Sequence, residues 1–220
     1  ALLGVFKPEQ IAEGDAAQGE AALRLFDLVE ARGIDLPPQS YLVRVLLLCA
    51  SHPDDTERLL AAARDAAAKT QQTEPQMYFR VSQVLLASKN PSPGLRFLGA
   101  AVNSIEPFGE PLAFHWFQMV YSRGEGDDIR HFVTTIRHPR EMLATIAAQF
   151  SGDEVPIETD TDARAEIAYW LGNGASTMNR DQAAEQGYRE ALALKPGHAW
   201  TLNNLGYLLL ERGDAFAEAG

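Results

Sequence analysis

The chain has 220 residues, a formal net charge of −11, a hydrophobic fraction of 46% and one cysteine. This length can bury a substantial core, the single cysteine rules out an internal disulfide framework, and the acidic charge disfavours phosphate backbones, so we expect no nucleic-acid partner. No stretch approaches the ~20 uninterrupted apolar residues of a membrane helix, so we expect no membrane insertion.

A first helix is predicted over about residues 15–32. Its expected end is Gly33, because glycine readily adopts the left-handed conformation that closes helices. Four apolar side chains share one face of this helix at helical spacing: Ala22, Leu25, Phe26 and Val29.

Three helix pairs are predicted next from helical periodicity and turn residues. They cover residues 40–70, turning at His52-Pro53-Asp54; residues 76–107; and residues 111–138, broken at Arg123-Gly124. In the second pair we expect Ser92 to cap the second helix and Pro93 to lie in its first turn. Cys49 lies in an apolar run of the first pair, where a free cysteine usually acts as a small core residue.

The C-terminal third contains a repeated pattern. Ala165, Leu171 and Gly172 recur 34 residues later as Ala199, Leu205 and Gly206, and between the two copies lie Ala184, Tyr188, Ala191 and Pro196. This pattern resembles the tetratricopeptide repeat: a glycine and an alanine let two antiparallel helices approach closely, an aromatic residue fills the space beside them, and proline ends the unit.

The resemblance implies an all-α fold of antiparallel helix pairs stacked as a right-handed superhelix, an α-solenoid. We expect three regions: an irregular, degenerate repeat array over 1–150, an acidic linker over 151–162, and clear repeats over 163–220. Within the last region, residues 165–198 form a complete repeat and 199–220 a truncated one. Because residue 1 is not methionine and the second repeat breaks off, we expect the chain to be a fragment.

In tetratricopeptide arrays the first helix of each pair lines a concave groove that receives a peptide or a helix. The resemblance therefore assigns a partner-binding groove to ten positions: Glu166, Tyr169, Trp170, Asn173, Thr177, Trp200, Asn203, Asn204, Tyr207 and Glu211. Asparagine amides can pair with a peptide backbone, and aromatic rings give contact area at low entropic cost. For Trp170 and Trp200, packing between repeats is an equally good interpretation.

Catalytic, metal and cofactor sites are not predicted. The sequence lacks a phosphate-binding glycine loop, a nucleophile elbow and a metal-binding motif, so we expect no enzyme. The acidic residues Asp153, Glu154, Glu158, Asp160 and Asp162 lack the pattern of a calcium loop and are expected to be solvated. His131 and His138 would share a face only if one helix ran through Pro139, which we do not expect.

The leading hypothesis is a bacterial protein-interaction scaffold that binds another protein or peptide, basic or neutral, in the concave groove. The alternative is a regulatory or substrate-recruiting domain of an enzyme whose catalytic part lies outside this chain. Self-association through the incomplete C-terminal repeat is a third possibility. The compartment stays open: we expect a soluble protein, with the cytoplasm slightly favoured over the periplasm or secretion, because residues 1–6 lack the basic start of a signal peptide.

Overall fold

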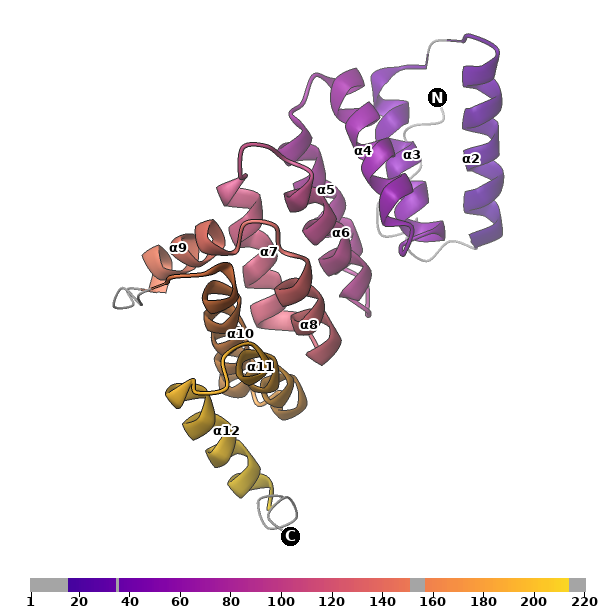
Figure 1. Cartoon of the computed structure of the whole chain (residues 1–220). Helices are drawn as coiled ribbons and strands as arrows, with labels where there is room; N and C mark the ends of the chain where they lie inside the picture. Colours follow the sequence, from indigo (N-terminus) through magenta and orange to yellow (C-terminus); the bar gives the residue numbers. More distant parts are fainter. Residues whose placement is uncertain (1–15, 35, 151–156, 214–220) are drawn as a thin grey trace. The chain divides into compact units, whose positions relative to one another are not determined.

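A computed structural model describes residues 16–34, 36–150 and 157–213 of the chain (Figure 1). Every regular element in these ranges is an α-helix, eleven in all, and strands are absent from them. Neighbouring helices pack pairwise as in an α-solenoid, which confirms the predicted fold class. The chain divides into two compact units, Ala1–Ile105 and Glu106–Gly220. None of the described helices is long and apolar enough to cross a bilayer.

The first unit contains two stacked helix hairpins preceded by one more helix. Its helices are α2 (Ala16–Ala31), α3 (Pro38–Ser51), α4 (Thr56–Thr70), α5 (Glu74–Leu86) and α6 (Ser92–Asn103). The α3–α4 and α5–α6 hairpins pack on each other mainly through α4, and α2 packs on α3. The predicted helix pairs over 40–70 and 76–107 are thus confirmed. Cys49 is buried in α3, as expected for a small core residue.

Local hydrogen bonds fix where these helices begin. After the His52-Pro53-Asp54 turn, Asp55 accepts a hydrogen bond from the backbone N–H of Arg58 at 3.1 Å and so caps α4. A capping box between Thr73 and Gln76 starts α5. Both caps satisfy backbone donors that a helix would otherwise leave without a partner.

The predicted cap of α6 is wrong in one detail. Ser92 is the first helical residue, and its own backbone N–H donates to Oδ1 of Asn90 at 3.1 Å. The N-cap position belongs to Pro91, which already has helical backbone angles (φ −77°, ψ −14°) and so starts the helix one residue earlier. Pro93 lies in the first turn, as predicted.

The apolar face predicted for α2 also needs correction. Leu23 is the buried apolar side chain of this helix, whereas Leu25 is 62% exposed. Because α2 packs mainly on α3 among the described helices, only a narrow side of it is covered. Gly19 lies on that side, close to Ser51 of α3. The predicted terminator, Gly33, has a positive φ of 68°, in agreement with the sequence.

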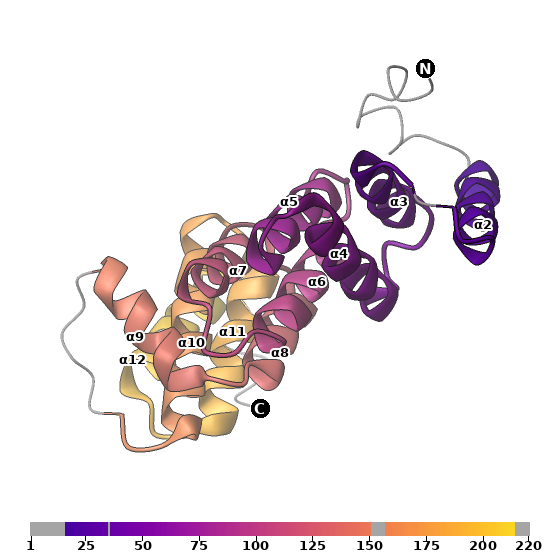
Figure 2. The same ribbon diagram turned by 90° about the horizontal axis from the view of Figure 1, so that it is seen from above.

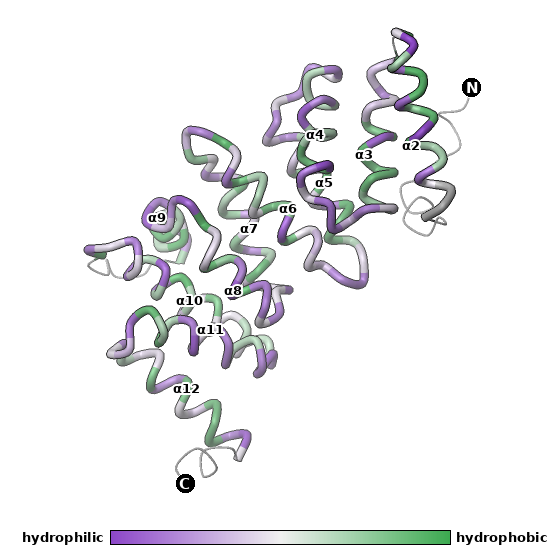
Figure 3. The backbone as a smooth tube through the Cα atoms, turned by 45° about the vertical axis from the view of Figure 1, so that its right-hand side comes forward, coloured by the Kyte–Doolittle hydropathy of each residue, from purple (hydrophilic) through white to green (hydrophobic). Residues whose placement is uncertain are grey.

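The second unit contains two hairpins, one additional helix and a final helix. Its helices are α7 (Glu110–Arg123), α8 (Gly126–Thr135), α9 (Pro139–Phe150), α10 (Asp160–Thr177), α11 (Asp181–Leu194) and α12 (Ala199–Arg212). The α7–α8 hairpin, confirmed with its break after Arg123, stacks on the α10–α11 hairpin, and α12 packs on α11. Figure 2 shows these helices from above, and Figure 3 colours the backbone by hydropathy, with hydrophobic and hydrophilic positions on each of them.

The close approach of α10 and α11 depends on glycine, as the repeat pattern predicts. A Cβ atom at Gly172 would lie 2.7 Å from Cδ1 of Tyr188 and 3.2 Å from the carbonyl oxygen of Ala184. A Cβ atom at Gly187 would lie 2.7 Å from the Cα of Gly172. Since these distances are far below ordinary contact, larger residues would force the two helices apart.

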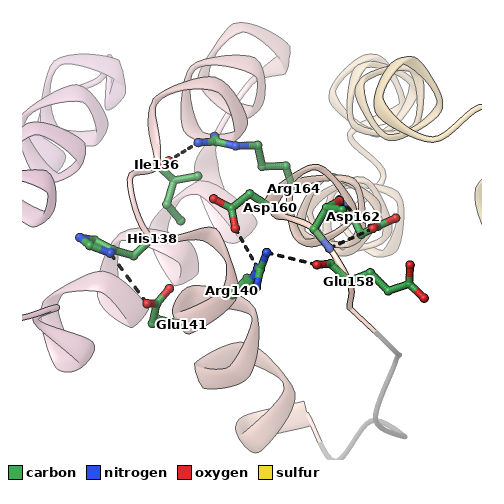
Figure 4. Close-up of polar contacts among 9 residues, drawn as sticks. Ile136, His138, Arg140, Glu141, Glu158, Asp160, Asp162 and Arg164 are labelled. Atoms are coloured by element: carbon green, nitrogen blue, oxygen red, sulfur yellow. Dashed lines mark hydrogen bonds and ion pairs between the residues drawn. The ribbon is translucent and has the colours of Figure 1, made fainter.

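Two arginines join the α10–α11 hairpin to the α7–α8 hairpin by donating hydrogen bonds to carbonyls at the C-terminal ends of α7 and α8. Arg164 of α10 donates to the backbone carbonyls of Val133 and Ile136, the latter at 2.5 Å and visible in Figure 4. Arg180 donates in the same way to the carbonyls of Tyr121 and Gly124. Carbonyls at a helix end lack partners within the helix, so each guanidinium satisfies two of them.

The boundary between the compact units does not coincide with the predicted regions. The boundary falls between residues 105 and 106 of the chain, and α7, α8 and α9 pack in the same unit as the repeat helices α10 and α11. The division into 1–150, 151–162 and 163–220 rests on the regularity of the sequence and stays a prediction. Of the predicted linker, residues 151–156 lie outside the described ranges, and α10 already begins at Asp160.

Candidate protein-binding site

The ten predicted groove residues lie on the first helices of the two clear repeats. α10 carries Glu166, Tyr169, Trp170, Asn173 and Thr177, and α12 carries Trp200, Asn203, Asn204, Tyr207 and Glu211. The structure brings the two sets together through side-chain contacts between the helices, but it gives their members very different exposure. Whether they bind a partner stays a prediction.

A chain of amides links α10 to α12. Asn204 donates through Nδ2 to Oδ1 of Asn173 at 2.9 Å, and the hydroxyl of Tyr188 donates to the same oxygen at 2.9 Å. Asn203 in turn donates to Oδ1 of Asn204 at 3.3 Å. The half-buried Asn173 and Asn204 thus hold the repeats together, and burial raises the pKa of the Tyr188 hydroxyl beside them.

Glu166 is buried rather than directed to a partner. Only 5% of it is exposed, and its Oε1 lies 2.7 Å from Nε2 of His198, which is 6% exposed. The other ring nitrogen of His198 accepts from the backbone N–H of Thr201 at 3.2 Å, so the imidazole caps α12 while it bonds to α10. This pair of side chains fixes the start of α12 on the preceding repeat.

The aromatic residues of the site divide into packed and exposed ones. Trp170 stacks on Phe150 of α9, with ring centroids 5.6 Å apart at 27°, and the half-buried Tyr169 contacts the His198 ring at 5.1 Å. By contrast, Trp200 is 69% exposed and Tyr207 is 62% exposed. The packing interpretation therefore describes Trp170, while Trp200 presents its ring to solvent.

The remaining predicted residues are on the surface. Asn203, Thr177 and Glu211 are exposed, and Thr177 donates its hydroxyl proton to the carbonyl of Gly174 at 2.8 Å. Trp200, Asn203, Tyr207 and Glu211 recur at helical spacing on one side of α12. These four residues together form a surface that we call the α12 face.

Three residues of the site escaped the sequence analysis. Phe150 stacks on Trp170 from α9, and His198 and Thr201 complete the buried contact with Glu166. The apolar residues Met142, Ile146 and Phe150, four apart, could have predicted α9. The pairing of Glu166 with His198 had no local signal, because the two residues lie 32 positions apart.

The acidic residues around the start of α10 have ordinary partners (Figure 4). Asp160 forms an ion pair with Arg140 of α9 at 2.8 Å, and Arg140 also donates to the backbone carbonyl of Glu158. Asp162 caps α10 with Thr159 and pairs with Lys195; the bond from Thr159 is the main reason that its pKa is lowered. Asp153 and Glu154 lie outside the described residues.

The histidines and cysteine do not converge on a common centre within the described ranges, where no three His, Cys, Asp or Glu side chains could hold a metal ion. His131 lies in α8 and His138 precedes α9, with the predicted helix break between them. His138 faces Glu106 at 3.4 Å and Glu141 at 3.9 Å. Burial raises the pKa of the Cys49 thiol to about 12.

Part of the chain is similar in sequence to a known protein. A stretch of 91 residues, 41% of this chain, is 34% identical to the probable biofilm formation methyltransferase WspC of Pseudomonas aeruginosa. That stretch amounts to 19% of the length of WspC. No family model matches the chain.

This match overturns one expectation from the sequence. The absence of catalytic motifs led to the prediction that the protein is not an enzyme, yet a relative at this identity is named as a methyltransferase. The prediction is therefore wrong as a general statement about this protein. The matched stretch covers 19% of that relative, so the relative's activity comes to this chain only as a proposal.

Proposed function

We propose that this chain is the protein-recruiting helical region of a methyltransferase-type protein, and that α10, α11 and α12 are tetratricopeptide repeats whose groove receives a segment of another protein. The observation that carries the proposal is the α12 face. It presents two large aromatic rings, Trp200 and Tyr207, to solvent on a well-anchored helix. Exposed aromatic residues of this kind are over-represented among the residues that dominate binding energy.

The anchoring of α12 supports this assignment. The Glu166–His198 bond and the Asn204–Asn173 bond hold the helix to the preceding repeat, and Arg212 pairs with Glu185 of α11 at its far end. A surface held at several points along one helix is organised before a partner arrives, so binding loses less conformational entropy.

The glycine packing supports the repeat assignment. Gly172 and Gly187 bring α10 and α11 into backbone contact, and Tyr188 fills the space beside them, which is the packing that the 34-residue pattern predicts. The similarity to a protein named as a methyltransferase supports the second half of the proposal, that the recruited protein serves methyl transfer.

The experiment is a pull-down from host lysate with a variant of the α12 face and a control variant of the same helix. Trp200→Ala/Tyr207→Ala removes the exposed rings, whereas Leu202→Ala removes a side chain that is 51% exposed on another side of the same helix. We expect a partner that the wild type and the leucine variant retain and the aromatic variant loses, with all three equally helical by circular dichroism. A partner retained equally by all three proteins would refute the binding site.

The captured partner is then incubated with labelled S-adenosylmethionine and the lysate fraction that contains the complex. Label in the partner that depends on the intact α12 face supports recruitment for methyl transfer. Binding without any dependence of labelling on the α12 face would leave a groove-binding protein and contradict the link to methylation.

A further inference from the structure

The additional helix of the second unit, α9, lies on the same side of the repeats as the proposed groove. It packs on α7 and α10, the first helices of the two hairpins, while the second helices α8 and α11 pack on each other. In Figure 1, α9 accordingly lies to the left of α7 and α10, and α8 lies to the right of α7. The chain thus already carries one helix on the first-helix side.

α9 runs alongside α10 in the same direction. Near its start, Arg140 pairs with Asp160 at the beginning of α10, and at its end Phe150 stacks on Trp170. Met142 and Ile146 are fully buried, and together with Phe150 they form a stripe of apolar residues spaced by four. The ring of Phe150 also contacts Tyr121 of α7 at 5.9 Å. An amphipathic helix therefore fits against aromatic rings of neighbouring first helices.

The next interval, between α10 and α12, offers the same kind of surface without such a helix among the described residues. Tyr169, Asn173 and Asn204 lie between the two helices, and Trp200 and Tyr207 stand exposed along α12. The two exposed rings are seven residues apart, about 10 Å along the helix axis. The stripe from Met142 to Phe150 spans eight residues, about 12 Å, so a helix of this kind could contact both rings.

We propose that the partner segment received by the α12 face is a basic amphipathic helix, seated beside α9 over α10 and α12, with apolar residues spaced by four and an aromatic residue at one end. This inference rests on the proposed function and specifies its partner. The basic character follows from charge: the acidic side chain of the α12 face is Glu211, the chain carries a net charge of −11, and α9 itself is held by Arg140 on an acidic residue.

The probe is a synthetic peptide with the sequence of residues 138–150 and the change Glu141→Gln, which leaves Arg140 as its charged side chain. It is labelled at its N-terminus, amidated at its C-terminus, titrated with the whole chain and followed by fluorescence anisotropy. We expect saturable binding. The Trp200→Ala/Tyr207→Ala chain should bind at least about tenfold more weakly, because aromatic anchors dominate such contacts. The Leu202→Ala chain should bind like the wild type.

Two altered peptides test the class of partner. Ile146→Pro prevents the helix and should weaken binding at least about tenfold, whereas Arg140→Glu reverses a charge and should weaken it several-fold. If the proline peptide binds as tightly as the unaltered peptide, the partner is not a helix. If the Arg140→Glu peptide binds as tightly, the partner is not basic. If the Trp200→Ala/Tyr207→Ala chain binds the peptide as tightly as the wild-type chain, the peptide binds elsewhere. Absence of binding together with a groove-dependent pull-down would overturn this inference alone, while failure of both would overturn the proposed function.

Discussion

The repeat positions Gly172 and Gly206 allow a test in which the same substitution has opposite effects. Replacing either glycine by alanine raises helix propensity by about 1 kcal/mol, since both lie inside helices. At Gly206 no atom of the described residues lies within 4 Å of the new Cβ, so Gly206→Ala should stabilise the protein by ~0.5–1 kcal/mol.

At Gly172 the same methyl group would clash with the ring of Tyr188. The new Cβ would lie 2.7 and 2.8 Å from two ring carbons of Tyr188, whereas carbon atoms normally keep ~3.5–4 Å apart. Tyr188 has little room to retreat, because it is 2% exposed and its hydroxyl bonds to Asn173. Overpacking of this kind costs about 1–3 kcal/mol. Because the propensity gain is common to both variants, this cost is also the expected difference between them.

Urea unfolding followed by circular dichroism measures that difference. With a slope of about 2 kcal/mol per molar urea, the midpoint of Gly172→Ala should fall ~0.5–1.5 M below that of Gly206→Ala. Equal midpoints for the two variants would refute the reasoning, since α10 and α11 would then accommodate the methyl group without separation.

Three further perturbations concern buried groups. Arg180→Met removes the donors that close α7 and should destabilise the protein by about 1–3 kcal/mol in urea unfolding; an unchanged midpoint would show those bonds to be dispensable. His198→Ala removes the cap of α12 and leaves Glu166 without its partner, so amide hydrogen exchange should accelerate in α12 and not in α7 or α8. Burial raises the pKa of Cys49 from 9.0 to about 12, so the thiol lowers the free energy of unfolding only as the pH rises from 9 towards 12. Cys49→Ala should lack this loss of stability in urea unfolding at high pH. The folded wild type should also resist alkylation at pH 8 until urea exposes the thiol.

The helix pairs could be predicted from the sequence because their turns depend on neighbouring residues. The caps by Asp55 and by Thr73 with Gln76 each join positions three apart, so the sequence alone carries the information. The break at Arg123-Gly124 is equally local. The cap predicted at Ser92 is wrong because two prolines surround this serine, and the backbone of Pro91 decides where the helix starts.

The candidate site could be predicted only in outline. The 34-residue repeat correctly placed its residues on α10 and α12, but their exposure depends on contacts that are distant in the sequence. Glu166 is buried by His198, 32 positions away, and Trp170 is covered by Phe150 of a helix that the sequence analysis did not identify. A family pattern names equivalent positions and leaves open what packs against each of them.

Equivalent positions in the two repeats differ in their exposure and in their contacts. Glu166 and Trp200 are 34 residues apart and share a repeat position, yet one is 5% exposed and joins two repeats, and the other is 69% exposed. Asn173 and Tyr207 show the same contrast, since the asparagine bonds to Asn204 and the tyrosine stands in solvent. The difference arises from neighbours: α10 has α7, α8, α9 and α11 packed around it, whereas α12 packs mainly on α11 among the described helices. Substitutions on α10 will therefore change stability together with binding, and only substitutions on the α12 face can measure binding by itself.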